Sequence, residues 1–312
     1  MQARGYTRWH PKKRGRLAVT ILGCLLALVL LAGHFVLAYG LPSARALSAD
    51  SADSSGSLPV LATGLQPLTN AGAFDLPVQV AKTTDTGFLQ LVNASHPLSS
   101  QSVPPRLVTA WPTVLASDHS TLLQSTALQA FSGLFQAAAD AQVGGLSVNS
   151  GYRDYAAQEL VYEQTTNKSY VQLPGQSEHQ TGLAADIEIC DAGQSSGISA
   201  AAEQWLVGHS WRYGLILRYP AGKQGITQIA YEPWHFRYIG EPHAWYCWEH
   251  GLCLEEYLDY LQDSGGYQVT LGATTYYVYY EAAQNGILYM PRSLDYEVSS
   301  DGCGGYIVTA WE

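Results

Sequence analysis

The stretch that decides the fold is residues 177–186, SEHQTGLAAD, and a second stretch, residues 232–235, EPWH, follows it much later in the chain. Together they supply two imidazoles and a carboxylate that could hold a metal ion, and a further carboxylate beside the last histidine. Two histidines and one aspartate leave a tetrahedral zinc ion with an open position for water, which is typical of catalytic rather than structural zinc. Such a water needs a nearby proton acceptor. The two stretches therefore predict a zinc hydrolase.

The first stretch offers His179 and Asp186 as metal ligands, with Gly182 between them to support a tight chain reversal. On its own this spacing is a weak signal, because exposed histidines and aspartates are common. Asp186 is more informative, since it lies in the apolar run 183–187. A carboxylate buried there needs a partner, and a metal ion is one.

The second stretch offers Glu232 and His235 on either side of a turn at Pro233. Residues three apart on an ideal strand face opposite sides, so the turn is needed for the two side chains to converge. The alternative is a surface ion pair beside a histidine that packs against Trp234 and Phe236.

Arg153 follows a predicted strand at the start of a predicted helix, where functional residues often lie. A guanidinium binds a carboxylate through two parallel hydrogen bonds, so Arg153 could hold a substrate carboxylate or stabilise an oxyanion. The alternative is a surface arginine paired with Asp154 or Glu159.

Three motifs in this order resemble the VanY-like D-alanyl-D-alanine carboxypeptidases. They are SGYR at 150–153, S-x-H-x-x-G-x-A-x-D at 177–186 and EPWHFRY at 232–238. The segments FLQLVN at 88–93 and YGLILRYP at 213–220 are also similar to this family. The resemblance covers about residues 88–260 and leaves out the N-terminal part and residues 265–312.

The resemblance implies a zinc ion (Zn2+) held by His179, Asp186 and His235, with Glu232 as the catalytic base. It also implies that Arg153 helps to bind the substrate and that Ser177 lines the site. The implied fold is the small α+β fold that these peptidases share with the hedgehog signalling domain. The implied substrate is the peptidoglycan stem peptide.

The N-terminal part predicts a membrane anchor. Residues 1–16 carry six basic and no acidic residues, and residues 17–39 carry no Asp, Glu, Lys or Arg over 23 positions, enough to cross a bilayer as a helix. The basic flank should stay in the cytoplasm, which places the remainder outside. A cleaved signal peptide is the alternative, because Ala44-Arg45-Ala46 has suitable small residues.

Charge and cysteine content fit an exterior location. All 26 acidic residues but only 10 of the 16 lysines and arginines follow position 39, and the resulting charge of −16 argues against nucleic acid as a partner. An oxidising exterior would permit disulfides, but their pairing is left open by the sequence. The four cysteines beyond the anchor are Cys190, Cys247, Cys253 and Cys303.

Helix and strand patterns interleave over residues 88–263 without regular βαβ alternation, which favours an α+β domain with a mainly antiparallel sheet. The expected helices cover 126–142, 154–165, 200–213 and 254–261, and the expected strands cover 88–92, 146–148, 183–189 and 232–238. Beyond SGG at 264–266, tyrosine-rich runs predict strands at 267–271, 274–280, 296–298 and 306–309.

The expected organisation is therefore a cytoplasmic basic segment (1–16), a transmembrane anchor (17–39), an extracytoplasmic stalk (40–87), a zinc carboxypeptidase domain (88–263) and a small β-rich extension (264–312). The extension is either a structural cover for the main domain or a binding module.

The expected activity is that of a D,D-carboxypeptidase acting on peptidoglycan outside the cell. An L,D-carboxypeptidase or a D,D-dipeptidase of the same fold is the nearest alternative. A zinc-containing wall-binding module without turnover is an alternative of another class, and the presence of Glu232 argues against it.

Overall fold

The structure is a computed structural model that describes residues 63–66, 74–79, 87–191, 194–282 and 286–312, all of them within one unit, Ser57–Glu312. The predicted basic segment, anchor and part of the predicted stalk lie outside these residues. Within the described ranges, no helix combines the length and the hydrophobicity that crossing a bilayer requires.

The first sheet, within residues 88–263, has the order β5-β6-β9-β8, and all of its neighbouring strands are antiparallel, as the sequence predicted. A short strand also pairs with β6 at its far end. The strands are β5 (Leu146–Ser150), β6 (Ala184–Asp191), β7 (Gln194–Ser196), β8 (Leu215–Leu217) and β9 (His235–Tyr238). The register places Asp186 opposite both Ser150 and His235, so the sheet itself brings distant polar residues together.

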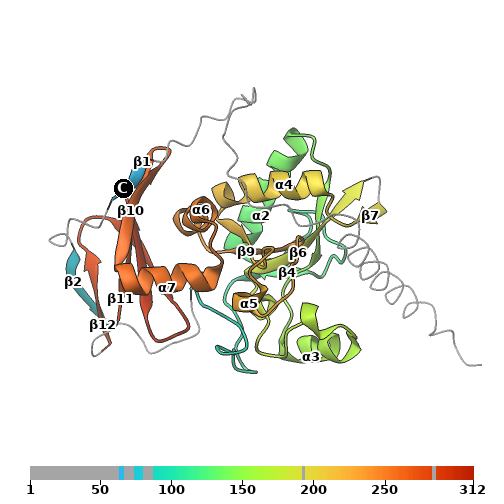
Figure 1. Ribbon diagram of the computed structural model, residues 1–312, viewed down its shortest axis with the longest axis horizontal. Helices are drawn as coiled ribbons and strands as arrows, with labels where there is room; N and C mark the ends of the chain where they lie inside the picture. Colours follow the sequence, from blue (N-terminus) through green and yellow to red (C-terminus); the bar gives the residue numbers. More distant parts are fainter. Residues whose placement is uncertain (1–62, 67–73, 80–86, 192–193, 283–285) are drawn as a thin grey trace, which may run out of the picture. The chain divides into compact units, whose positions relative to one another are not determined.

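Helices α2 (Ser125–Asp140) and α4 (Ala200–His209) contribute to the core that this sheet shares, and Figure 1 shows them beside the sheet. The helical spacing of Leu128, Phe131 and Phe135 predicted α2, and all three side chains are buried there. The Ser199 hydroxyl caps the N-terminus of α4 by accepting a hydrogen bond from the Ala202 amide.

Several short elements complete the part of the chain that precedes α6. Helix α3 (Tyr155–Gln164) is capped at its N-terminus by Asp154, whose side chain accepts a hydrogen bond from the Ala157 amide. The others are β3 (Leu107–Thr109), β4 (Leu122–Gln124), the 3-10 helices η2 (Lys168–Tyr170), η3 (Glu178–Thr181) and η4 (Ser210–Tyr213), and α5 (Gln224–Thr227).

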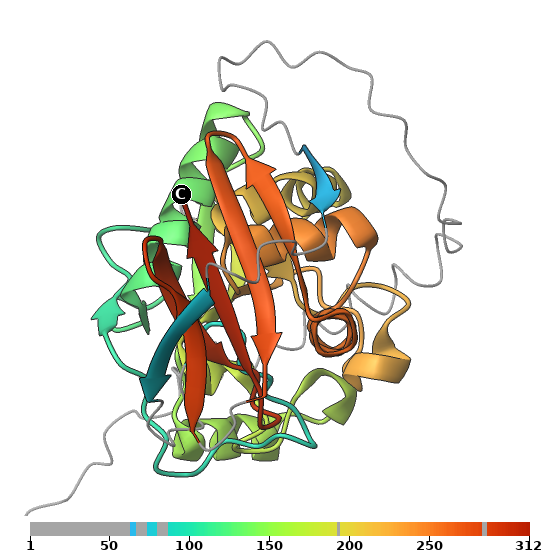
Figure 2. The same cartoon turned by 90° about the vertical axis from the view of Figure 1, so that its left-hand side faces the viewer.

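Two further helices and a second sheet complete the described chain. Helices α6 (Glu241–His250) and α7 (Leu254–Ser264) precede a five-stranded sheet of order β1-β10-β11-β14-β13, drawn in orange and red, with β1 in blue, in Figure 2. Its strands are β1 (Thr63–Gln66), β10 (Gly266–Leu271), β11 (Thr274–Glu281), β13 (Asp295–Ser300) and β14 (Tyr306–Trp311). A two-stranded sheet pairs β2 (Phe74–Gln79) with β12 (Ile287–Pro291).

The second sheet shares a hydrophobic core with residues next to and within the first sheet. Ile216 and Ile239 belong to the same buried cluster as Tyr267, Val278 and Ile307. Residues 266–312 therefore pack as part of this unit of the fold.

The structure corrects the expected strand at 88–92, which is a non-strand segment. Two of its amides form hydrogen bonds with residues in or just after β13. The Leu89 amide donates to Ser299 Oγ at 2.8 Å, and the Leu91 amide donates to the Asp301 carbonyl at 2.9 Å. Its carbonyls at Phe88 and Gln90 accept hydrogen bonds from one guanidinium nitrogen of Arg237. The apolar residues of this segment are therefore buried by packing, although the segment does not form the hydrogen-bond pattern of a strand.

The elements that the sequence did not predict include β8, α6 and β12. Pro242 at the start of α6 is compatible with a helix, because the first helical positions need no intrahelical amide partner. The expected strand at 232–238 begins only at His235, since the turn at Pro233 precedes it.

Candidate metal centre

His179 is placed by η3 and by the loop that follows β5. Gly182 ends η3 with φ +66°, and its amide donates to the His179 carbonyl, so the chain reverses between His179 and β6. His179 Nδ1 lies 2.7 Å from the Gly151 carbonyl oxygen. Because that contact requires a proton on Nδ1, Nε2 is left with its lone pair for a metal.

Asp186 and His235 are cross-strand partners in β6 and β9. Asp186 Oδ1 lies 3.0 Å from His235 Nδ1, and Asp186 Oδ2 lies 3.3 Å from His179 Nε2. One donor atom from each of the three residues lies within 4.8 Å of the others. The three predicted ligands therefore converge on one point.

The donor set fits a divalent metal ion. Burial, with the charge of Arg153, lowers the pKa of His179 to about 4, so its imidazole is neutral at pH 7 as a ligand must be. Burial alone would raise the pKa of Asp186, but the two histidines hold it well below its usual range. Burial alone would lower the pKa of His235, but the carboxylates of Asp186 and Glu178 raise it to about 9. A proton on His235 thus compensates the carboxylates, and a cation at the cluster would take over that task.

Glu232 lies beside the cluster because the chain turns at Pro233, with the His235 amide donating to the Glu232 carbonyl at 3.2 Å. Glu232 Oε2 lies 3.7 Å from His235 Nδ1, and the side chain is buried. The predicted convergence of these two residues is confirmed. Burial raises the pKa of Glu232 to about 8, which suits a group that must exchange protons near neutral pH.

Arg153 faces the cluster instead of forming the predicted alternative pairs. Its Nη1 donates to Ser150 Oγ at 2.8 Å and lies 3.9 Å from Asp186 Oδ2, while its Nε donates to Gln158 Oε1 at 3.0 Å. About a fifth of its side chain is exposed, which leaves the guanidinium accessible to a bound molecule. Ser177 is buried at the residue that begins η3.

Comparisons with known proteins identify the family of this chain. The family model described as VanY, D-alanyl-D-alanine carboxypeptidase, matches residues 120–241. The D-alanyl-D-alanine carboxypeptidase of Enterococcus faecium is 33% identical over 239 residues, which cover 72% of this chain and 75% of that protein. The chain belongs to the VanY family of D-alanyl-D-alanine carboxypeptidases.

Two further relatives show the range of this family. The bifunctional D-Ala-D-Ala dipeptidase and D-Ala-D-Ala carboxypeptidase VanXYC of Enterococcus gallinarum is 39% identical over 186 residues, covering 55% of this chain and 94% of that protein. The crystal structure of the vancomycin resistance D,D-dipeptidase VanXYg, in complex with a D-Ala-D-Ala phosphinate analogue, matches with a TM-score of 0.64 at 25% identity. That match covers 80% of this chain and all of that one.

Sequence reasoning missed a buried charged group beside this VanY-family site. Glu178, Arg218 and Arg237 are each essentially inaccessible to solvent, and Glu178 lies within ion-pair distance of both arginines. The available signal was the position of Arg218 at the end of the apolar run 215–218 and of Arg237 between two aromatic residues in the run 235–239. Charged residues in such runs are rarely buried without a partner.

Among the described residues, the other histidines and the cysteines are not part of this ligand cluster. His209 stacks on Trp205 with ring centroids 4.3 Å apart and belongs to the packing of α4. His243 is buried and structural. All four cysteines beyond the predicted anchor are free thiols in the structure, with Cys247 and Cys253 buried.

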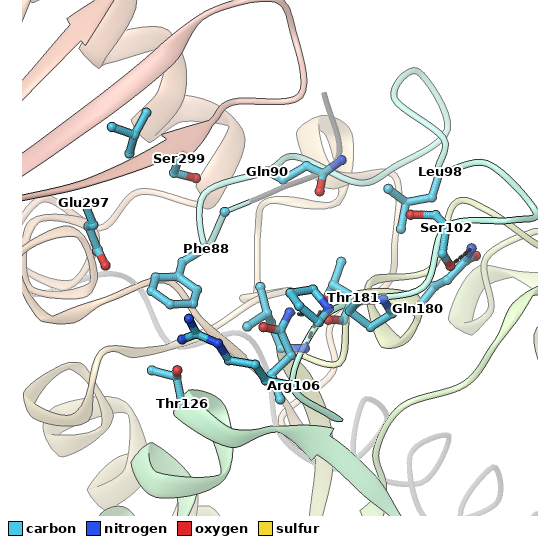
Figure 3. Close-up of a pocket in the computed structure, with 16 residues that line it drawn as sticks. Phe88, Gln90, Leu98, Ser102, Arg106, Thr126, Gln180, Thr181, Glu297 and Ser299 are labelled. Atoms are coloured by element: carbon cyan, nitrogen blue, oxygen red, sulfur yellow. Dashed lines mark hydrogen bonds between the residues drawn. The ribbon is translucent and has the colours of Figure 1, made fainter. Parts of the chain in front are cut away.

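A cavity of about 250 Å³ lies beside η3 (Figure 3). Gln180 and Thr181 of η3, the loop at Phe88 and Glu297 of β13 line it. None of the three predicted ligands lines this cavity, so it is separate from the metal centre.

Proposed function

We propose that this protein is a zinc-dependent D,D-carboxypeptidase that removes the terminal D-alanine from peptidoglycan stem peptides outside the cell. The observation that carries the proposal is the convergence of His179, Asp186 and His235, with the buried carboxylate of Glu232 alongside. Membership of the VanY family and the names of its relatives supply the substrate class.

In this proposal His179, Asp186 and His235 hold zinc, which when bound supplies a Lewis acid that polarises a peptide carbonyl and activates water. Glu232 takes the proton of the attacking water and passes it to the leaving amine. Positive charge at the ligand cluster favours the ionised form of Glu232 that this step needs, although burial raises its pKa.

Arg153 is proposed to bind the substrate, either through the carboxylate of the last residue or at the oxyanion that develops on the scissile carbonyl. Its Nη1 already lies 3.9 Å from Asp186, so a group bound to Arg153 would be close to the ligand cluster. Ser177 is proposed to line the same site from the start of η3.

A D,D-dipeptidase is the second candidate, because one relative is bifunctional and another is described as a D,D-dipeptidase. The two activities differ in the length of peptide that they accept. A comparison of a pentapeptide stem with free D-Ala-D-Ala as substrates distinguishes them.

The proposed location follows from the N-terminal sequence. We infer that residues 1–16 are cytoplasmic, that residues 17–39 anchor the chain in the membrane, and that 40–87 form a stalk before the peptidase domain (88–263) and its β-rich extension (264–312). Protease added to intact cells should release the peptidase domain. Protection of the domain, with an external control protein cleaved, would contradict this topology.

The test of the activity uses residues 58–312 as a soluble protein, loaded with zinc and incubated with a pentapeptide stem. We expect loss of one D-alanine by mass spectrometry and about one zinc ion per chain. Glu232→Gln should keep the zinc and lower turnover by about 10²-fold or more, since it removes the proton acceptor and keeps the size.

The controls separate the roles. His179→Ala should lose zinc and activity together, because it removes a ligand. Full activity in Glu232→Gln would remove Glu232 from the mechanism. A zinc-loaded wild-type protein that leaves D,D and L,D stem peptides intact would favour a wall-binding module instead.

A further inference from the structure

Glu178 is a fully buried carboxylate next to the proposed ligand His179 in the sequence, and its side chain contacts the other proposed histidine ligand, His235. Its Oε1 lies 2.7 Å from Arg218 Nε and 2.9 Å from Arg237 Nη1. One oxygen of Glu178 therefore lies within ion-pair distance of two guanidinium groups.

The second oxygen of Glu178 faces His235. Oε2 lies 3.7 Å from His235 Nε2, and each of these buried atoms lacks a hydrogen-bond partner within the described part of the chain. Two unpaired polar atoms that face one another in a buried position are costly unless they pair. A closure of less than 1 Å would make a hydrogen bond between them.

The two nitrogens of His235 therefore have different surroundings. Nδ1 faces Asp186 at 3.0 Å and Glu232 at 3.7 Å, so it is the nitrogen directed into the ligand cluster. For Nδ1 to ligate a metal as neutral imidazole, the proton must be on Nε2. Glu178 Oε2 is placed to accept that proton in a hydrogen bond.

We propose that Glu178 is a positioning residue that fixes the tautomer and the ring orientation of His235, with Arg218 and Arg237 holding the carboxylate in place. This inference rests on the metal site of the proposed function. Carboxylate partners of this kind raise the affinity of a histidine for its metal. The surrounding arginines keep Glu178 ionised, because their charges hold its pKa well below the usual range.

The arginines are themselves held from outside the site. Arg218 donates from Nη1 and Nη2 to the carboxylate of Glu255 at 2.8 and 2.7 Å. Arg237 donates to the carbonyls of Phe88 and Gln90. Glu178 thus has a fixed position, and Glu255 offers a matched control, because it belongs to the same charge network without contacting His235.

The test measures zinc affinity by competition with a chelator, and the visible spectrum of the cobalt-substituted protein, for the wild type, Glu178→Gln and Glu255→Gln. In Glu178→Gln the amide NH₂ cannot face two guanidinium groups, so it should point at His235 and favour a proton on Nδ1. We expect zinc affinity to fall by about 10–100-fold with a changed cobalt spectrum. Glu255→Gln should stay within about threefold of the wild type.

A conservative variant covers the case in which Glu178→Gln does not fold. Glu178→Asp keeps the charge for the arginines but shortens the reach to His235, so a smaller loss of zinc affinity and an altered spectrum are expected. Zinc affinity and spectrum equal to the wild type in the folded Glu178 variant would overturn the proposal. So would an equal loss of affinity in Glu255→Gln.

The outcomes also separate this inference from the proposed activity. A wild-type protein that binds zinc without hydrolysing any stem peptide would overturn the proposed function and leave the Glu178 result standing. A wild-type protein that binds no zinc would overturn both.

Discussion

At the scale of single residues, His243 shows how a histidine can serve the fold. Its Nδ1 lies 2.6 Å from the Tyr257 hydroxyl and its Nε2 lies 2.9 Å from Thr309 Oγ1, which links α6 to α7 and β14. Burial lowers its pKa to about 3. A folded-state pKa below the unfolded value means that the unfolded chain binds more protons between these two pKa values.

We therefore expect the free energy of unfolding to fall as pH decreases from about 6.5 to about 3, by up to about 1.4 kcal/mol per pH unit from this residue. Chemical denaturation at a series of pH values measures the slope. His243→Gln should be less stable at pH 7 but show a shallower slope. His250→Gln, at an exposed position of the same helix, should keep the wild-type slope. An unchanged slope in His243→Gln would contradict the assignment.

At the scale of elements, the loop between β5 and α3 is shaped by Gly151. A Cβ added there would lie 2.5 Å from the Leu122 carbonyl oxygen and 2.8 Å from Thr121 Cγ2, so the loop would have to move. The same loop supplies the Gly151 carbonyl that orients His179 and also carries Arg153. The proposed ligand His179 and the proposed substrate-binding residue Arg153 are therefore positioned by one turn.

Gly151→Ala should weaken zinc binding by about tenfold or more, because it displaces a carbonyl that orients a ligand. Gly208→Ala is the matched control, since its added Cβ has no atom within 4 Å and lies in α4. That change should raise the free energy of unfolding by about 0.5–1 kcal/mol and leave zinc binding unchanged. Wild-type zinc affinity in Gly151→Ala would show that the loop tolerates the shift.

At the scale of the unit formed by residues 57–312, the five-stranded sheet that contains β10, β11, β13 and β14 supports the candidate site. Arg237 connects Glu178 to the carbonyls of Phe88 and Gln90, and the amides of Leu89 and Leu91 bond to the second sheet. The buried cluster that includes Ile307 would be exposed without that sheet. This packing favours the interpretation of residues 264–312 as a structural cover for the main domain over their interpretation as an independent binding module.

Removal of residues 266–312 should therefore prevent folding of the remaining peptidase domain, as judged by solubility and a cooperative thermal transition. Ile307→Ala should cost about 2–5 kcal/mol by denaturant unfolding, because its side chain is fully buried. Ile226→Ala is the control at a position that is 42% exposed, and a small effect is expected. A soluble truncated protein that binds zinc with wild-type affinity would show that the sheet is dispensable.

The sequence by itself determined the donor set, the longer helices α2, α3, α4 and α7, and the strands β5, β6 and β9. Helix α2 follows from helical spacing, and α4 and η4 end where Gly214 begins a turn with positive φ, as local rules require. The convergence of Glu232 and His235 follows from the turn at Pro233. These features depend on residues close together in the chain, so local pattern and turn chemistry are sufficient to predict them.

The tertiary structure decided which distant residues meet. The register of β6 and β9 pairs Asp186 with His235 over 49 positions, and Glu178 meets Arg218 over 40 positions. The segment at 88–92 satisfies its amides against residues about 210 positions away, so its strand-like pattern misled a local prediction. Such pairings are selected by burial and by the cost of leaving buried charges and backbone groups unpaired, and both depend on the whole assembled core.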